Sequence, residues 1–413
     1  MTTKDLYDIG EIPPLGHVPE KMYGWAIRRE RQGPPSEAMV VEALPVWELG
    51  PKDVLVFNMA AGVNYNGVWA SRGEPVSVFD VHEVPYHIAG SDSSGIVWAV
   101  GSAVTNWKVG DEVVVHCNQT GGDDEACNGG DPMYSLSQKI WGYETPEGSF
   151  AQFSRVQAQQ LMPRPQHLTW EEAACYTLTL ATAYRMLFGH MPHELKPGQN
   201  VLVWGASGGL GVFAVQLITA AGANAIGVIS DESKRDFVMS LGAKGVLNRK
   251  DFNCWGQLPT VNSDDYKQWF AEARKFGKAI WDITGKGVNV DMVFEHPGEV
   301  TFPVSTFVVK RGGMVVFCAG TTGFNLTMDA RYVWMHQKRI QGSHFAHLQQ
   351  AASANRLVIE KRINPCLSEV FKWDDIPDAH MKMMNNQHAP GNMACLVGAK
   401  RPGMTTLEEA RAE

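Results

Sequence analysis

The 413-residue sequence lacks the features that would place a protein in a membrane or on nucleic acid. It contains no run of about 18 apolar residues, so we expect no membrane-spanning helix. The formal net charge is −8 and the basic residues form no run, which argues against a nucleic-acid partner. The opening stretch MTTKDLYDIGEIPPLG has no apolar core of the signal-peptide kind.

Cysteine is also scarce. The seven cysteines are odd in number and scattered along the chain, which suits reduced thiols better than a disulfide framework. We therefore expect a cytoplasmic protein with neither a membrane nor a nucleic-acid partner.

The length exceeds what one hydrophobic core usually supports, so the sequence predicts more than one domain. Up to about residue 170, short apolar runs such as DVLVFNMAAGV, SGIVWAVGS and DEVVVHC alternate with Gly, Pro and Asp turns. This pattern predicts a β-rich domain. From Trp170 the pattern becomes helical, with Thr169 as N-cap. The polar end of the chain, KRPGMTTLEEARAE, is expected to be solvated.

The segment VLVWGASGGLGVFAVQL (201–217) has the parts of a nucleotide-binding turn between a strand and a helix. Gly208 would let the backbone approach a pyrophosphate, and Gly211 would let the helix pack closely on the strand. The free N–H groups at the helix start would hold the phosphates. The predicted cofactor-binding residues of this turn are Gly205, Ala206, Ser207, Gly208, Gly209, Leu210 and Gly211.

Strands and helices alternate after this turn, which predicts a parallel, doubly wound sheet. Residues 251–286 interrupt the rhythm with apolar residues at helical spacing. We interpret this insertion as an amphipathic helix that packs on its own domain or on another subunit, rather than as a substrate contact. The apolar residues are Tyr266, Trp269, Phe270, Ala273, Phe276 and Ile280.

The residue near the end of the second strand discriminates between the two nicotinamide dinucleotides. Ser230 stands where an acidic residue would bind the ribose 2′-hydroxyl of NAD, and Lys234 and Arg249 lie nearby. A serine among cations suits the 2′-phosphate of NADPH. Asp231 argues for NADH, unless it caps the helix that follows.

A β-rich front domain joined to a mid-chain nucleotide fold resembles the medium-chain dehydrogenase/reductase superfamily. The resemblance implies an α/β protein with a GroES-like catalytic domain (1–170) and a Rossmann domain with a doubly wound parallel sheet (171–345). A return to the catalytic domain and a C-terminal tail (346–413) would follow. Asn64 and Ser91 stand where the zinc-dependent members have Cys and His ligands. We therefore expect no metal and favour reduction of an activated C=C bond over alcohol oxidation.

Three longer motifs, NYNGVW (64–69), IWGYETPEGSFAQF (140–153) and KRIQGSHFAH (338–347), resemble the crotonyl-CoA carboxylase/reductase family. The insertion at 251–286 supports the resemblance. It implies that NADPH delivers a hydride to the β-carbon of an enoyl-CoA and that CO2 captures the enolate. Crotonyl-CoA would give ethylmalonyl-CoA. The resemblance also implies a cytoplasmic homotetramer, arranged as a dimer of dimers.

The same resemblance assigns a CO2 pocket to an Asn, an aromatic residue, a Glu and a His. The last three fall on Tyr143, Glu144 and His344, whereas Asn64 and Asn66 both remain candidates for the first. Each residue also has a purely structural interpretation. Asn64 and Asn66 would satisfy the hydrogen bonds of a turn, Glu144 would be an acid in a surface turn, and His344 would be a hydrogen-bonded core histidine.

Two other functions remain open. The first is a plain NADPH-dependent enoyl-CoA reductase, in which water or Tyr65 protonates the enolate. The second is a protein that binds the cofactor but catalyses no reaction. Several basic residues are candidates for binding the phosphates of CoA. Some of them would lie on one helical face of RYVWMHQKRI. The alternative is that they are solvated surface charges. The candidates are Arg331, Lys338, Arg339, Lys361 and Arg362.

Overall fold

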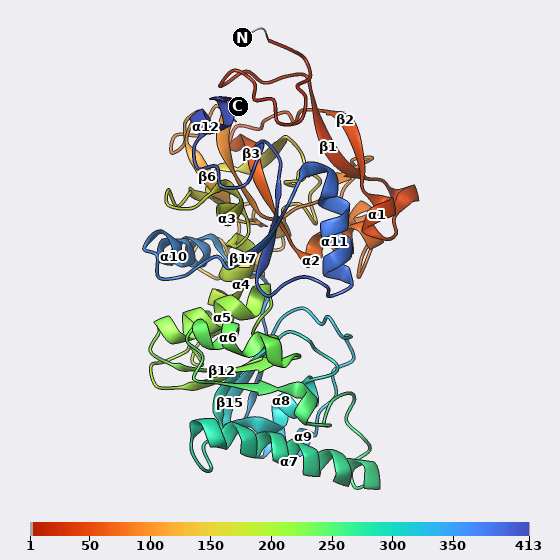
Figure 1. The fold of residues 1–413 in the computed structure, drawn as a ribbon, viewed down its shortest axis with the longest axis vertical. Coiled ribbons are helices and arrows are strands. Elements are labelled where there is room, and N and C mark those ends of the chain that lie inside the picture. The colour runs from red at the N-terminus through yellow and green to blue at the C-terminus, as the bar shows by residue number, and fades with distance from the viewer. Residues whose placement is uncertain (1–2, 413) are drawn as a thin grey trace. The chain divides into compact units, whose positions relative to one another are not determined.

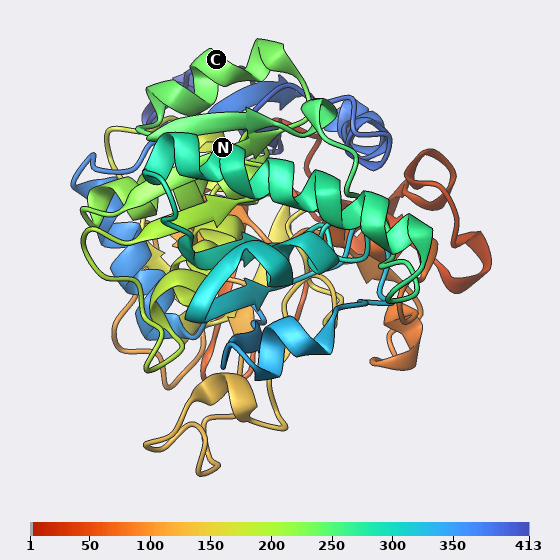
Figure 2. The ribbon, with the colours of Figure 1, turned by 90° about the horizontal axis from the view of Figure 1, so that it is seen from below.

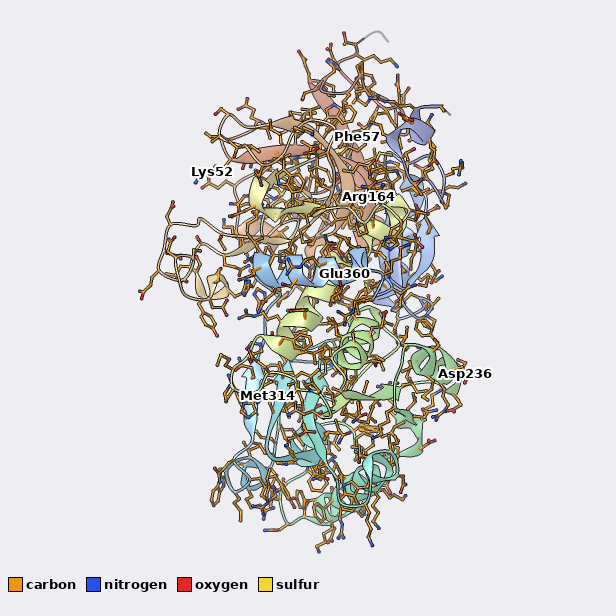
Figure 3. All side chains as sticks on the ribbon, turned by 90° about the vertical axis from the view of Figure 1, so that its left-hand side faces the viewer. Lys52, Phe57, Arg164, Asp236, Met314 and Glu360 are labelled. Atoms are coloured by element: carbon orange, nitrogen blue, oxygen red, sulfur yellow. The ribbon has the colours of Figure 1, made fainter. Side chains whose placement is uncertain are left out.

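The computed structural model describes residues 3–412, and the chain divides into two compact units. The first unit combines Met1–Leu178 with His347–Glu413, and the second is Thr179–Ala346. The chain thus leaves the first unit, builds the second from one continuous segment and returns (Figure 1). Phe57 and Met314, labelled in Figure 3, lie in the interiors of the first and the second unit.

The first unit is built around β3 (Asp53–Val63), an almost wholly buried and mostly apolar strand that is rich in valine. It pairs antiparallel with three other strands, so it forms the centre of a largely antiparallel sheet. The three partners are β5 (Ser93–Val100), β9 (Phe153–Gln157) and β18 (Asn392–Leu396). The sheet order is β10-β6-β5-β3-β18-β17, with β10 (Leu161–Pro163), β6 (Glu112–Val115) and β17 (Leu367–Phe371) completing it.

A smaller sheet and two helices lie against this core. The smaller sheet has the order β2 (Val40–Pro45), β1 (Lys21–Ile27) and β4 (His87–Ile88). Helix α2 (Tyr65–Arg72) begins directly after β3 and packs against α11 (Ile376–Met384). The two helices approach closely at Gly67, where an added Cβ would lie 2.3 Å from Nε2 of His380.

The helical pattern that begins at Trp170 forms two helices rather than one. Helix α3 (Trp170–Ala174) starts with the expected Thr169 cap, in a capping box with Glu172. A new helix, α4 (Thr177–Phe188), then starts at Thr177. The break has a physical cause, because the buried carboxylate of Asp92 accepts hydrogen bonds from the Thr177 hydroxyl and the Leu178 amide. Asp92 therefore caps a second helix start.

The second unit contains the predicted parallel sheet, which is confirmed with the order β13-β12-β11-β14-β15-β16. Helix α5 (Gly209–Ala220) packs against the second and third of these strands, and α8 (Phe302–Val308) packs against the fourth and fifth. The strands are β13 (Gly245–Asn248), β12 (Asn224–Ile229), β11 (Asn200–Val203), β14 (Val290–Glu295), β15 (Val309–Phe317) and β16 (Arg339–Gly342).

The insertion forms one long helix, α7 (Asp264–Thr284), whereas residues 251–263 contain no α-helix. Figure 2 shows α7 running across the second unit. Five of its apolar residues are buried in the same core cluster as Leu202 and Trp204 of the β11 region. The helix therefore packs on its own unit through its apolar face.

The polar C-terminal segment is mostly exposed, as the sequence predicted, but it is also anchored to the first unit. Helix α12 (Leu407–Ala412) closes it, and Met404 and Ala410 are buried. The carbonyl of Met404 accepts a hydrogen bond of 3.0 Å from the Trp170 amide, and the Gly403 amide donates to Glu171 at 2.7 Å. Two apolar side chains and these bonds therefore hold in place a segment that is otherwise exposed.

In residues 3–412, no helix combines the length and the apolar character that crossing a bilayer requires.

Candidate functional site

The glycine-rich turn joins β11 to α5 in the geometry expected of a phosphate-binding turn. Gly208 is the N-cap of α5 and provides no side-chain cap, so the first N–H groups of the helix are left for a ligand. Gly205 has a φ of 55°, which favours glycine. An added Cβ on Gly211 would lie 2.2 Å from the carbonyl oxygen of Gly205, so only glycine allows this tight turn.

The turn contains all seven predicted residues: Gly205, Ala206, Ser207, Gly208, Gly209, Leu210 and Gly211.

The predicted ribose-binding residues lie at the carboxyl edge of the same sheet. Ile229 of β12 is in register with Asn248 of β13, so Ser230 and Arg249, each one residue further on, lie at neighbouring strand ends. Lys234 is at the start of α6 (Arg235–Ser240).

The Asp231 carboxylate is engaged within the protein. It caps the short 310-helix Glu232–Lys234 and accepts a hydrogen bond of 2.9 Å from Lys250 Nζ. The bond from Lys250 holds the pKa of Asp231 below its usual range. This arrangement fits the capping role that the sequence left open, and it supports the NADPH interpretation.

The first unit brings the two candidate asparagines to the start of α2. Asn64 is the N-cap residue, and its Nδ2 donates to Oδ2 of Asp92 at 2.9 Å. Asn66 is only 6% exposed, and its Nδ2 donates to the Ser91 hydroxyl at 3.2 Å. Both asparagines are therefore oriented by the segment that contains Ser91, and the geometry does not favour one over the other as a ligand contact.

Asp92 is a functional candidate that the sequence reasoning did not single out. Its carboxylate is fully buried and accepts hydrogen bonds from Asn64, Thr177 and Leu178. Burial raises the pKa of Asp92 to about 7, and these hydrogen bonds oppose the shift. The available signal was an acid within a Gly/Ser stretch directly before a buried strand, since such an acid needs partners.

Tyr143 and Glu144 lie on the loop of residues 140–148. The Tyr143 hydroxyl donates to the Glu74 carbonyl at 3.0 Å. Glu144 folds back, so that its Oε2 accepts from the Ile140 amide at 2.7 Å. Burial raises the pKa of Glu144, and it raises the pKa of Tyr143 to about 12.

Trp69 of α2, which the sequence reasoning missed as a site residue, connects this loop to the asparagine helix. Its ring centroid lies 5.2 Å from that of Tyr65 and 6.5 Å from that of Tyr143. The aromatic row Tyr65–Trp69–Tyr143 thus brings three predicted or newly found site residues together within the first unit.

His344 belongs to the second unit and follows β16. Its side chain is exposed, and its ring centroid lies 4.5 Å from that of Phe345. The exposure argues against a core histidine. The predicted partnership of His344 with Glu144 stays a prediction.

The candidate CoA cations do not share a helical face. Helix α9 (Ala330–Trp334) is only five residues long, so Lys338 and Arg339 lie beyond it. Lys338 is buried and donates to the carbonyls of Thr306 and Phe307 at 2.8 and 3.0 Å. Arg331 pairs with Asp329 at 2.7 Å, and Arg339 donates to the Met191 carbonyl at 2.6 Å. Lys361 and Arg362 are exposed on the first unit.

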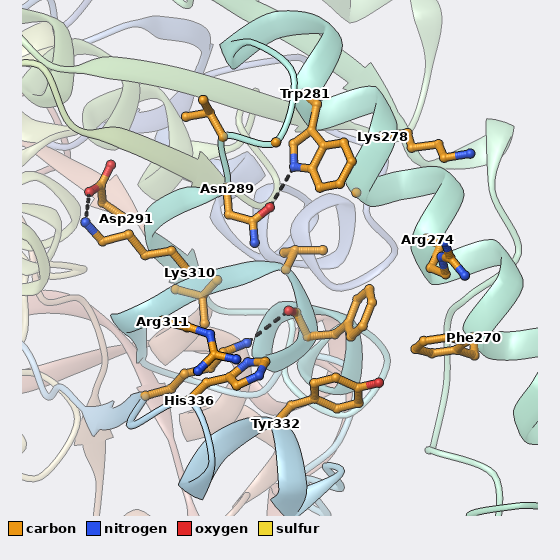
Figure 4. Close-up of a pocket in the computed structure, with 17 residues that line it drawn as sticks. Phe270, Arg274, Lys278, Trp281, Asn289, Asp291, Lys310, Arg311, Tyr332 and His336 are labelled. Atoms are coloured by element: carbon orange, nitrogen blue, oxygen red, sulfur yellow. Dashed lines mark hydrogen bonds and ion pairs between the residues drawn. The ribbon is translucent and has the colours of Figure 1, made fainter.

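A separate groove of about 710 Å3 lies between α7, α9 and the amino ends of β14 and β15 (Figure 4). Trp281 and Asn289 are hydrogen-bonded at 2.6 Å on one wall. The glycine turn follows the carboxyl end of β11, so it occupies the opposite edge of the parallel sheet. This groove is therefore distinct from the phosphate-binding turn.

Among the residues that the structure describes, no group of three or more His, Cys, Asp or Glu side chains is placed to hold a metal ion. Independence of zinc stays a prediction, based on Asn64 and Ser91 at the ligand positions.

Comparisons with known proteins agree with this architecture. Residues 50–166 match the alcohol dehydrogenase GroES-like domain, and residues 209–360 match the family described as zinc-binding dehydrogenase. The crotonyl-CoA carboxylase/reductase of Cereibacter sphaeroides is 74% identical over 98% of this chain and 94% of its own length. The crotonyl-CoA reductase of Streptomyces collinus is 41% identical over 93% of this chain and 87% of its own.

Solved structures of related enzymes are also similar to this chain. A crotonyl-CoA carboxylase/reductase superposes with a TM-score of 0.97 at 75% identity, covering 98% of this chain and 95% of the other. The crotonyl-CoA carboxylase/reductase AntE in complex with NADP gives 0.92 at 46% identity, over 97% and 100% of the two chains. The 2-octenoyl-CoA carboxylase reductase CinF, in complex with NADP and 2-octenoyl-CoA, gives 0.88 at 35%, over 96% and 92%. The chain belongs to the crotonyl-CoA carboxylase/reductase family.

Proposed function

We propose that this protein reductively carboxylates a short-chain enoyl-CoA, with NADPH as hydride donor and crotonyl-CoA as preferred substrate. The product from crotonyl-CoA is ethylmalonyl-CoA. The observation that carries this conclusion is the 74% identity to the Cereibacter sphaeroides crotonyl-CoA carboxylase/reductase over nearly the whole chain.

NADPH, when bound, supplies the hydride that adds to the β-carbon of the enoyl thioester. The turn from Gly205 to Gly211 binds the pyrophosphate through backbone N–H groups at the start of α5. Ser230, Lys234 and Arg249 bind the 2′-phosphate. The engagement of Asp231 by Lys250 supports this assignment, because the ion pair offsets part of the repulsion between this carboxylate and a phosphate.

The carboxylation step requires that CO2 reach the enolate before a proton does. Tyr143, Glu144, His344 and either Asn64 or Asn66 form the CO2 pocket in this proposal. A side-chain amide donates to one CO2 oxygen, and Glu144 and His344 hold a water that binds CO2 without reaching the α-carbon. The fixed orientation of both asparagines supports a preorganised pocket.

The competing function is a plain enoyl-CoA reductase, in which water or Tyr65 protonates the enolate. Relatives from Streptomyces at 42% and 41% identity are named crotonyl-CoA reductase, which makes the distinction worth measuring. Tyr65 packs against Trp69, which in turn packs against Tyr143, so its hydroxyl belongs to the same part of the first unit and is the candidate proton donor in this alternative.

The remaining expectations concern the state of the protein in the cell. We propose a cytoplasmic homotetramer, arranged as a dimer of dimers and acting without zinc. The seven free cysteines, none of them in a disulfide within the described residues, support a reducing compartment.

The deciding experiment follows NADPH oxidation with crotonyl-CoA, with and without saturating bicarbonate and carbonic anhydrase, and identifies the products by mass. We expect CO2-stimulated turnover to a product heavier by one carboxyl group. Turnover to butyryl-CoA that is indifferent to CO2 would establish the plain reductase, and absence of turnover would leave a binding protein.

A further inference from the structure

The loop of residues 140–148 lies directly on the segment that contains β4. The Ile88 amide donates to the Pro146 carbonyl at 3.1 Å, and the Gly148 amide donates to the Ile88 carbonyl at 3.0 Å. Gly142 packs so tightly that an added Cβ would lie 1.9 Å from the Gly90 carbonyl oxygen, at a φ of 72°. The second half of the loop is thus held by main-chain hydrogen bonds and Gly142 by close packing.

His87 of β4 contributes the side-chain contact to this loop. Its ring is fully buried, and its Nε2 lies 3.3 Å from the Gly142 carbonyl oxygen. A carbonyl can only accept, so Nε2 carries the hydrogen and donates it. Burial lowers the pKa of His87 to about 3, which keeps the ring neutral.

His82 fixes the other side of the same ring. In the neutral tautomer, Nδ1 of His87 has no hydrogen and accepts, and His82 Nε2 lies 3.0 Å from it. The two rings are nearly parallel, at 9°, with centroids 5.3 Å apart. The Gly142 carbonyl requires this tautomer of His87, and a hydrogen bond donated by His82 Nε2 to His87 Nδ1 stabilises it.

The peptide that His87 holds is the one that joins Gly142 to Tyr143. Its N–H is also bound, because the Tyr143 amide donates to the Ile140 carbonyl at 3.1 Å. A peptide bond is planar, so fixing its oxygen and its N–H fixes the direction in which the chain enters Tyr143 and Glu144. Glu144 is then held by its amide and its carboxylate, both on Ile140 at 2.7 Å.

We infer that His87, oriented by His82, is a positioning residue for CO2 capture: it holds the Gly142–Tyr143 peptide and thereby aims Tyr143 and Glu144. This inference rests on the proposed function. His87 and His82 take no part in hydride transfer, so their loss affects the competition between CO2 and a proton for the enolate rather than the reduction itself.

The test uses the intact enzyme and measures the ratio of carboxylated to protonated product at several CO2 concentrations, together with the rate of NADPH oxidation. His87→Leu removes the donor to Gly142, and we expect the KM for CO2 to rise roughly tenfold, in line with one buried hydrogen bond. His87→Gln keeps an N–H near the position of Nε2, and we expect it to recover most of the carboxylated fraction. The KM for NADPH stays unchanged in both.

Asn355→Leu is the matched control. Asn355 is also buried in the first unit and donates to a backbone carbonyl, that of Pro163, at 3.0 Å. It makes no bond to the 140–148 loop, so we expect lower stability with an unchanged product ratio. If His87→Leu fails to fold, His82→Phe supplies the measurement, since it keeps an aromatic ring but removes the donor to Nδ1.

An unchanged product ratio in the foldable variants at these two positions would overturn the inference, as would failure of His87→Gln to restore what His87→Leu loses. A proportional loss of carboxylation and NADPH oxidation would also overturn it. If the unmodified enzyme makes only the protonated product, the proposed function itself fails, and that result is visible before any variant is made.

Discussion

Glu144 has two roles, one in the shape of its loop and one in the proposed CO2 pocket, and a single substitution can separate them. One carboxylate oxygen accepts from the Ile140 amide and shapes the loop, while the raised pKa reflects a half-buried carboxyl group. The resemblance assigns the same group to the water that binds CO2. A glutamine at this position retains an oxygen for Ile140 but loses the charge.

Glu144→Gln is therefore expected to reduce the carboxylated fraction by roughly tenfold or more, as removal of one preorganised electrostatic contact does. NADPH oxidation should fall much less, because hydride transfer does not use this group. Product masses at limiting CO2 check the prediction, with Glu144→Ala as the variant that also loses the loop bond. His344→Asn should behave in the same way, and equal losses of both activities would assign these residues to folding or reduction.

Ser230→Asp tests the cofactor assignment. A carboxylate at the end of β12 repels the 2′-phosphate and accepts from the ribose 2′-hydroxyl, so preference should move from NADPH toward NADH by roughly tenfold or more. The ratio of kcat/KM for the two cofactors is the measurement. Arg249→Ala should weaken NADPH alone, and an unchanged ratio in both variants would mean that the 2′-phosphate binds elsewhere.

At the scale of elements, local patterns predicted the fold well because they are properties of short segments. The glycine turn, the strands from Asn224 to Phe317 and the Thr169 cap follow from spacing and residue type alone. The interruption between α3 and α4 could not be predicted this way, since its cause is Asp92, which is more than 80 residues away in the chain.

The candidate site shows the same limit. Its motif residues could be named from the sequence, whereas Asp92, Trp69 and His87 acquire their roles from contacts between segments that are distant in the chain. The anchoring of the C-terminal segment belongs to this class too, because its partners, Trp170 and Glu171, precede it by more than 200 residues.

Helix α5 gives a test at this scale. Gly211→Ala places a Cβ 2.2 Å from the Gly205 carbonyl oxygen, so the helix must shift and the phosphate-binding N–H groups shift with it. We expect weaker NADPH binding and a lower Tm. Gly277→Ala is the opposite case, since no heavy atom outside the helix's own backbone lies within 4 Å of the Cβ that this change adds to α7. It should stabilise by about 0.5–1 kcal/mol, and thermal unfolding with and without NADPH compares the two.

The whole molecule responds to pH through groups that are buried without an opposite charge. Glu295 is fully buried and accepts hydrogen bonds from Gly298, Thr301 and Ser305, and burial raises its pKa to about 7. In the unfolded chain the Glu295 carboxyl releases this proton near the ordinary glutamate pKa of 4.5. Between these pH values the folded state binds the extra proton, so Glu295 lowers stability as pH rises.

Glu295→Gln removes this titration. Relative to the variant, the unmodified protein should lose up to roughly 1.4 kcal/mol of unfolding free energy per pH unit between about 4.5 and 7. The constant effect of altered hydrogen bonds does not change this slope. Parallel Tm profiles of the two proteins across that window would show that Glu295 is ionised in the folded state.

The order in which the chain is synthesised bears on its first unit. Strand β18 (Asn392–Leu396) pairs with β3 and β17, so the sheet that orients Asn64 lacks an interior strand until residue 396 has left the ribosome. The second unit is one continuous segment and can fold earlier. A nascent chain paused before residue 392 would therefore display a completed nucleotide-binding fold beside an unfinished β-sheet with two exposed strand edges, which makes chaperone engagement most valuable at that late stage.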